Sequence, residues 1–268
     1  NIHIVPLVVT LDGKTYYEGV DVQPQEFYDL LAGTESLPTT SQPSPGDFAE
    51  LYEKLAANDP DILSIHMSSG LSGTFNSAQE GAKLGPQATV TRVATNPLFA
   101  AAGWQVQAAS KGAKAGWPLD KILAQMDEIS AASDSIYTLN DLEYLIHGGR
   151  ISHMKGLVAS LLNIKPIIGV EKEGGTYVQL GQVRYFKRAT TGIVERMVKQ
   201  HGQGRALRVQ VMHSNNLDGA AILREQVVKN FDCTWLPTSA ISRVLGAQTR
   251  PALVADAYAP RTAFNDID

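Results

Sequence analysis

The segment at residues 68–74, SSGLSGT, constrains the fold of this chain more than any other feature of the sequence. Residues 62–67 before it form an alternating apolar run that predicts a strand, whereas residues 75–84 after it predict a helix. A strand that enters a helix through two glycines and four hydroxyl side chains presents free backbone N–H groups at the positive end of the helix dipole. The segment therefore predicts either an anion-binding loop or a plain helix cap in which the glycines serve the turn.

The predicted elements before about residue 153 alternate between strands and helices, which indicates a parallel α/β sheet. Strands are predicted at residues 2–9, 62–67, 89–94 and 135–139, and helices at residues 24–31, 75–84, 97–111 and 118–130, from Pro45 and after Asn140. Asp12 and Gly13 predict a hairpin turn. Ser44 and Asp47 resemble a capping box at the helix that begins at Pro45.

The pattern changes after Asn163. A hairpin is predicted over residues 164–171 and 176–186, followed by helices at 190–200 and 217–230 and strands at 206–213, 233–236 and 252–254. The predicted fold class is therefore α/β, with a parallel-sheet N-terminal domain over residues 1–153 and a mixed-sheet α+β C-terminal domain over residues 154–268.

Composition excludes several classes of protein. The net charge of −4 argues against a general nucleic-acid binder. A single cysteine, Cys233, excludes an intramolecular disulfide and a cysteine-cluster metal site, and it fits a reducing compartment, so we expect a cytoplasmic location. No apolar run approaches the ~18 residues of a membrane span. The chain has no initiator Met and opens on strand-like residues, from which we expect its true start to be missing.

A catalytic interpretation of the same loop stays open. Residues 70–74 nearly match the Gly-x-Ser-x-Gly nucleophile elbow, with Thr74 at the last position. An esterase-like enzyme using Ser72 or Ser69 would need a general base within reach, and none of the six histidines carries a signature for that role. His66 precedes the loop and is interpreted as a core residue. The chain has no P-loop, and no metal site is predicted.

Arg150 follows two glycines at the predicted end of a helix. An arginine placed there can project into an interdomain cleft and pair with a carboxylate or phosphate. The alternative is that it compensates the dipole at the C-terminus of its own helix.

Five segments occur together in an order that resembles the DegV family of bacterial fatty-acid-binding proteins. They are residues 5–7, 40–44, 68–74, 142–152 and 164–167. The resemblance implies two α/β domains with a fatty acid between them, its tail in an apolar tunnel and its carboxylate held by hydroxyl groups. It also implies a binding protein without a cofactor, rather than an enzyme, that presents the acyl group to a separate fatty acid kinase. Transient contact with a membrane surface would be compatible with this role.

The residues that match the head-group site of that family are Thr40, Ser41, Ser68, Ser69 and Arg150, and Ser72 adds a further hydroxyl. The physical requirement agrees with this assignment, because a buried carboxylate is costly unless it is hydrogen-bonded or paired with a cation.

The chain also departs from the family pattern. The first strand of the family, with its Asp-Ser loop, is absent, and Thr95-Asn96 stands where an Asp-Ser or Asp-Thr turn is usual. Gln248 replaces a histidine that helps to bind the carboxylate, Arg250 replaces a glycine, and Tyr185 replaces a common threonine. We expect these changes to face the pocket. They leave a second hypothesis, in which a DegV scaffold with a changed or engineered pocket binds another ligand.

Overall fold

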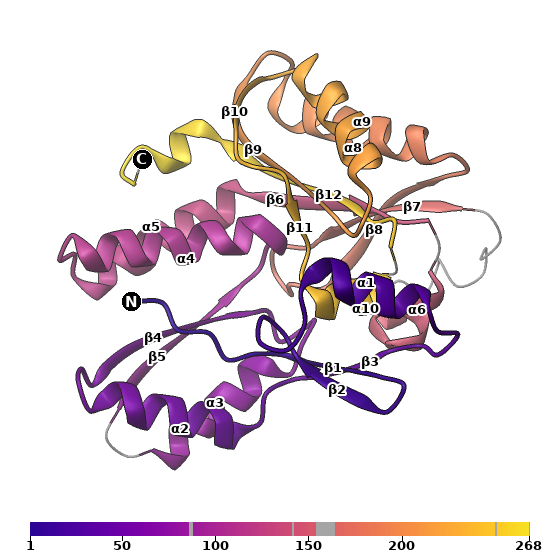
Figure 1. Cartoon of the computed structure of the whole chain (residues 1–268). Coiled ribbons are helices and arrows are strands. Elements are labelled where there is room, and N and C mark those ends of the chain that lie inside the picture. The colour runs from indigo at the N-terminus through magenta and orange to yellow at the C-terminus, as the bar shows by residue number, and fades with distance from the viewer. Residues whose placement is uncertain (86–87, 141, 154–163, 250, 268) are drawn as a thin grey trace.

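The computed structural model describes residues 1–85, 88–140, 142–153, 164–249 and 251–267. The described strands form three sheets, and helices pack between and around them (Figure 1).

The first sheet is antiparallel, in the order β2-β1-β3. Its strands are β1 (Val8–Leu11), β2 (Lys14–Tyr17) and β3 (Thr39–Ser41), with α1 (Pro24–Ala32) between β2 and β3. The predicted hairpin turn is confirmed, because Asp12 and Gly13 have φ of 50° and 74°, the left-handed values that a tight hairpin needs. The predicted strand over residues 2–9 is wrong at its start. Residues 1–7 form no strand, and the side chains of Ile2 and Ile4 are exposed instead of packed.

The second sheet pairs β4 (Asp61–Met67) with β5 (Thr89–Thr95) in parallel, as predicted. The helices α2 (Pro45–Ala56) and α3 (Thr74–Leu84) pack against it, and the helices α4 (Phe99–Lys114) and α5 (Leu119–Ala132) cover its other face. The capping box of α2 is confirmed. Ser44 Oγ accepts the backbone N–H of Asp47 at 3.2 Å, and Asp47 Oδ2 accepts the N–H of Ser44 at 2.7 Å.

The third sheet is mixed, in the order β10-β9-β12-β6-β7-β8, with β11 also paired to β9. Its strands are β6 (Asp134–Thr138), β7 (Lys165–Val170), β8 (Tyr177–Val183), β9 (Ala206–His213), β10 (Asp232–Trp235), β11 (Ser239–Ala240) and β12 (Val254–Pro260). One face packs on α4 and α5, and the other on α8 (Phe186–His201) and α9 (Leu217–Val228). The layers therefore run from α2 and α3, through β4 and β5, then α4 and α5, to the mixed sheet and finally α8 and α9 (Figure 1).

The placement of β6 differs from the prediction. It was expected in the parallel sheet, but it lies in the mixed sheet, antiparallel to both β12 and β7. Its two faces are both buried, because Ile136 packs toward α8 and Tyr137 toward α4. The mixed sheet thus takes strands from both sides of residue 153, and the domain boundary expected there stays a proposal.

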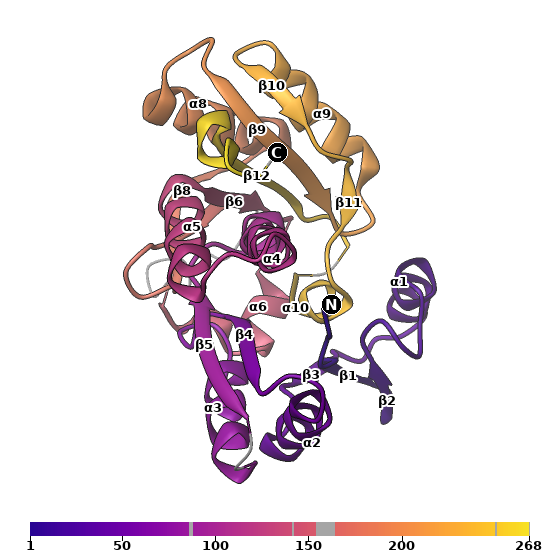
Figure 2. The same cartoon turned by 90° about the vertical axis from the view of Figure 1, so that its left-hand side faces the viewer.

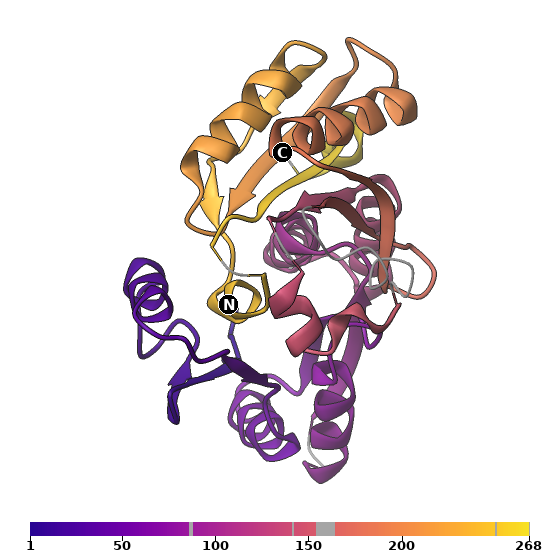
Figure 3. The ribbon, with the colours of Figure 1, turned by 90° about the vertical axis from the view of Figure 1, so that its right-hand side faces the viewer.

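Short helices fill the space between the first sheet and the mixed sheet. They are α6 (Glu143–His147), the 3-10 helix η1 (Arg150–His153) and α10 (Arg243–Thr249), whereas the 3-10 helix η2 (Arg261–Phe264) packs against α5 and β9. The predicted helix cap at Asn140 is wrong, because the N-cap of α6 is Leu142. α10, which the sequence pattern did not reveal, contacts α6, β1 and β3 and lies near the middle of the molecule (Figures 2 and 3).

Candidate functional site

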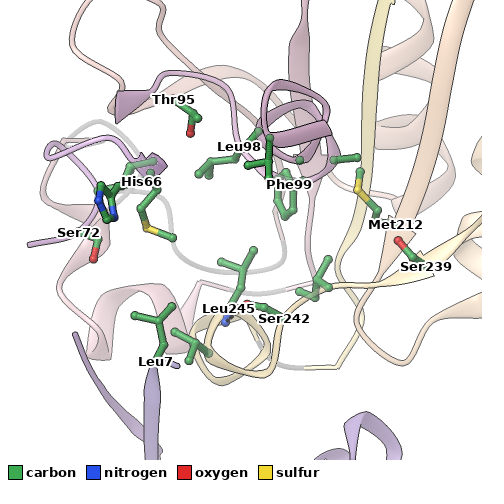
Figure 4. A pocket seen from close by; sticks show the side chains of 18 of the residues that line it. Leu7, His66, Ser72, Thr95, Leu98, Phe99, Met212, Ser239, Ser242 and Leu245 are labelled. Carbon is green, nitrogen blue, oxygen red and sulfur yellow. Dashed lines mark hydrogen bonds between the residues drawn. The ribbon is translucent and has the colours of Figure 1, made fainter. Parts of the chain in front are cut away.

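A cavity of about 710 Å³ lies where the three sheets meet around α4 and α10. Its wall is apolar along most of its length and includes Met67 and Leu71. Figure 4 shows Leu98, Phe99 and Leu245 facing the cavity. Polar side chains gather at the end beside the N-terminus of α3. They are Thr40, Ser41, Gln42, His66, Ser72, Arg150 and Gln248.

Thr40 and Gln248 meet at this polar end, although 208 positions separate them in the chain. Gln248 lies on α10 and its Nε2 donates to Thr40 Oγ1 at 2.9 Å. The structure therefore brings the predicted residue Thr40 and the predicted replacement Gln248 into direct contact in the cavity wall. Ser41, the last residue of β3, lines the cavity beside them.

Residues of the SSGLSGT loop have two different roles. Ser72 lines the cavity, and its Oγ lies 2.8 Å from Thr74 Oγ1 and accepts the backbone N–H of Thr74 at 3.3 Å. The N-cap of α3 is Gly73, so neither Ser72 nor Thr74 is the cap residue itself. Because Ser72 lies at the positive end of the helix dipole and faces the cavity, an anion placed there would be favoured.

The first residues of the loop face away from the cavity lining. The hydroxyl of Ser68 is buried and donates to the carbonyl of Gly175, in the turn between β7 and β8, and Ser69 is exposed. Gly70 lies so close to this turn that a Cβ there would be 2.7 Å from the carbonyl oxygen of Gly174. Ser68 and Gly70 thus attach the loop to the mixed sheet, and their assignment to the head group stays a prediction.

Arg150 lines the cavity and lies at the start of η1. Its Nη1 donates to the carbonyl of Gly148, the C-cap residue of α6, at 2.5 Å. Both sequence interpretations are therefore met in part, since the guanidinium compensates the helix end and also faces the cavity. Within the described part of the chain no carboxylate pairs with Arg150, which leaves its other donors available to an anionic group.

His66 is a site residue whose role the sequence did not identify. It lines the cavity at the end of β4, and its Nε2 lies 2.8 Å from Ser64 Oγ, which in turn lies 2.7 Å from Tyr52 OH. Burial, together with the smaller effect of the nearby Arg92, lowers the pKa of His66 to about 4, so the imidazole is neutral at physiological pH. Its position at the carboxyl end of a parallel strand was the signal available.

The departures from the family pattern fall in different places. Thr95 lines the cavity, and its buried Oγ1 has no hydrogen-bond partner among the residues that the structure describes. Asn96 instead donates to the carbonyl of Lys172 at 2.5 Å, in the β7–β8 connection. The expectation that Tyr185 faces the pocket is wrong, because this side chain is 72% exposed at the N-terminus of α8. Arg250 lies outside the described residues.

The geometry gives the esterase hypothesis no support. Among the described residues no histidine is hydrogen-bonded to Ser72, and His66 is bonded to Ser64 instead. The same part of the chain contains no group of three or more side chains that could hold a metal ion. No described helix combines the length and apolar character that crossing a membrane requires.

Comparison with known proteins places this geometry in a family. The sequence model described as "Uncharacterised protein, DegV family" matches residues 1–261. A DegV domain-containing protein of Deinococcus radiodurans is 31% identical over 261 residues, which cover 97% of this chain and 90% of that protein.

Solved structures agree. The structure of "DegV, a fatty acid binding protein from Bacillus subtilis" matches with a TM-score of 0.86 and 28% identity, covering 97% of this chain and 92% of that one. A DegV family protein from Thermus thermophilus, whose description reports fatty acid binding, matches with a TM-score of 0.85 and 28% identity over 96% of this chain and 91% of that one. The resemblance that the sequence motifs suggested is confirmed, and this chain belongs to the DegV family.

Proposed function

We propose that this chain binds a long-chain fatty acid in the cavity, with the carboxylate at the polar end and the tail along the apolar wall. The observation that carries the proposal is the combination of one continuous apolar cavity of about 710 Å³ with an arginine and several hydroxyl groups at one end. Fatty-acid binding by the structurally similar proteins of Bacillus subtilis and Thermus thermophilus supports the same ligand class.

The energetics favour such a ligand. Burial of a tail of ~16 CH2 groups contributes ~0.8 kcal/mol for each group, from which the cost of immobilising the chain is subtracted. A carboxylate in the same enclosed site is tolerated only if it is hydrogen-bonded or paired with a cation. Arg150 supplies the positive charge, and Thr40, Ser72 and Gln248 line the same cavity and can supply hydrogen bonds.

Replacement of Arg150 tests the head-group assignment. We expect Arg150→Ala to weaken palmitate binding by roughly ten-fold or more, because a charge-assisted hydrogen bond contributes ~1.5–3 kcal/mol. Arg188→Ala, on the exposed face of α8, is the matched control and should bind palmitate as the unchanged protein does. Equal affinity of Arg150→Ala and the control, measured by titration calorimetry, would contradict the assignment.

We also propose that the bound acid is presented to a separate acyl kinase in the cytoplasm, as the family resemblance implies. The test is formation of acyl phosphate from ATP when a kinase subunit is added to the loaded protein. Acyl phosphate that forms equally well without this chain would contradict the proposed presentation.

A further inference from the structure

The cavity has a second polar end, opposite the head-group cluster. Figure 4 shows Ser239 at the far side of the cavity from Ser72 and His66. Three further polar side chains line this cavity. Each is linked to Ser239 or to another of the three by a hydrogen bond or by lying on the same strand. They are Gln107 on α4 and Arg208 and Gln210 on β9.

Hydrogen bonds fix the side chains of Gln107, Gln210 and Ser239 at this second polar end of the cavity, the distal end. Gln210 Nε2 donates to the carbonyl of Pro237 at 3.0 Å and to Ser239 Oγ at 3.3 Å. Arg208 Nη2 donates to Gln107 Oε1 at 2.7 Å. These two pairs orient each amide before any ligand arrives.

The guanidinium of Arg208 adds a buried charge to this end. The side chain is only 4% exposed, and its guanidinium carbon lies 4.3 Å from the ring centroid of Phe264 and 5.5 Å from that of Trp104. Packing against aromatic rings holds the guanidinium, and with it the Gln107 amide that it bonds, in place in the cavity wall.

The side-chain amides of Gln107 and Gln210 each have one hydrogen-bonding atom that a ligand can use. Within the described residues, Gln107 Nε2 and Gln210 Oε1 make no hydrogen bond. A terminal methyl group that reached this end would displace water from both amides and return no hydrogen bond. A hydroxyl group would restore the bonds, since it donates to Gln210 Oε1 and accepts from Gln107 Nε2.

We propose that the cavity is built for an aliphatic acid that carries a second polar group at its far end, such as an ω-hydroxy or α,ω-dicarboxylic acid. The inference rests on the proposed function, because the first carboxylate occupies the Arg150 end. Gln107 and Gln210 bond the distal group, and Arg208 holds the Gln107 amide in position.

The first test compares three ligands of equal chain length on the unchanged protein. They are hexadecanoic acid, 16-hydroxyhexadecanoic acid and hexadecanedioic acid, titrated by calorimetry below their critical micelle concentrations. We expect the hydroxy acid to bind about five-fold more tightly than hexadecanoic acid, the factor that one additional hydrogen bond provides. Equal binding, or tighter binding of hexadecanoic acid, would overturn the proposal. Failure of all three acids to bind would instead refute the proposed function on which it rests.

The second test changes the ligand preference of the protein by substituting Gln210. Gln210→Leu should bind hexadecanoic acid more tightly than 16-hydroxyhexadecanoic acid, which reverses the order expected for the unchanged protein. Leucine favours the methyl terminus and offers no hydrogen-bond partner to a hydroxyl group. Gln182→Leu, exposed on β8, is the matched control and should keep the preference of the unchanged protein. A Gln210→Leu protein that binds hexadecanoic acid and still prefers the hydroxy acid by the original factor would overturn the assignment of Gln210.

Discussion

The carboxyl group of Asp256 gives the sharpest test of the packing of the mixed sheet. Asp256 lies on β12 and is fully buried, between Ile136 and Val211 of the neighbouring strands, and neither of its side-chain oxygens has a hydrogen-bond partner among the described residues. Burial raises its pKa well above the ordinary value of 3.8, so the folded protein keeps this group protonated where the unfolded chain releases the proton.

The sign of the effect follows from proton linkage. Because the folded state binds one more proton than the unfolded state above pH 3.8, the free energy of unfolding falls as pH rises. The loss is ~1.36 kcal/mol for each pH unit until the folded-state pKa is reached. Asp256→Asn removes the titration and keeps the shape, so the variant should gain stability over the unchanged protein by that amount per pH unit.

Urea denaturation at several pH values between about 5 and about 8 measures this difference directly. Asp127→Asn, on the exposed face of α5, is the control and should leave the pH dependence as it was. A difference in stability between Asp256→Asn and the unchanged protein that stays constant over this range would refute the reasoning, because it would show that Asp256 ionises in the folded state as it does in the unfolded chain.

Two further substitutions test the loop and the head-group site. Gly70→Ala should lower the free energy of unfolding by about 1–3 kcal/mol, because the added Cβ would lie 2.7 Å from the carbonyl oxygen of Gly174. Gly85→Ala meets open space and should change stability far less, and equal urea midpoints for the two variants would contradict this. Gln248→His should tighten palmitate binding several-fold at pH 6, where an imidazolium beside Thr40 would add a charge-assisted bond. A calorimetric affinity that stays unchanged at pH 6 would show that the Gln248 position does not reach the carboxylate.

Local sequence signals predicted the elements that local interactions determine. The strand β4, the loop after it and α3 followed from periodicity and turn chemistry, and the capping box at Ser44 followed from the spacing of two polar residues. Thr40, Arg150 and Gln248, which motif resemblance singled out, share one cavity in the structure with Ser72, which the loop itself indicated.

Features that depend on long-range packing could not be predicted in this way. Nothing in the residues of β6 tells which sheet the strand joins, because a strand buried on both faces fits either sheet. β12 was predicted as residues 252–254 but extends over Val254–Pro260, since its alternating alanines carry little strand signal. The distal polar end arises from α4, β9 and β11, which only the folded chain brings together.

Native mass spectrometry of the purified protein, followed by organic extraction, tests the central claim most directly. We expect a bound species with the mass of a long-chain aliphatic acid, released on denaturation, and uptake of added palmitate or oleate by any empty fraction. An empty protein that takes up neither acid would contradict the proposed fatty-acid binding and would favour a DegV scaffold whose pocket, with Gln248 in place of histidine, has been changed for another ligand.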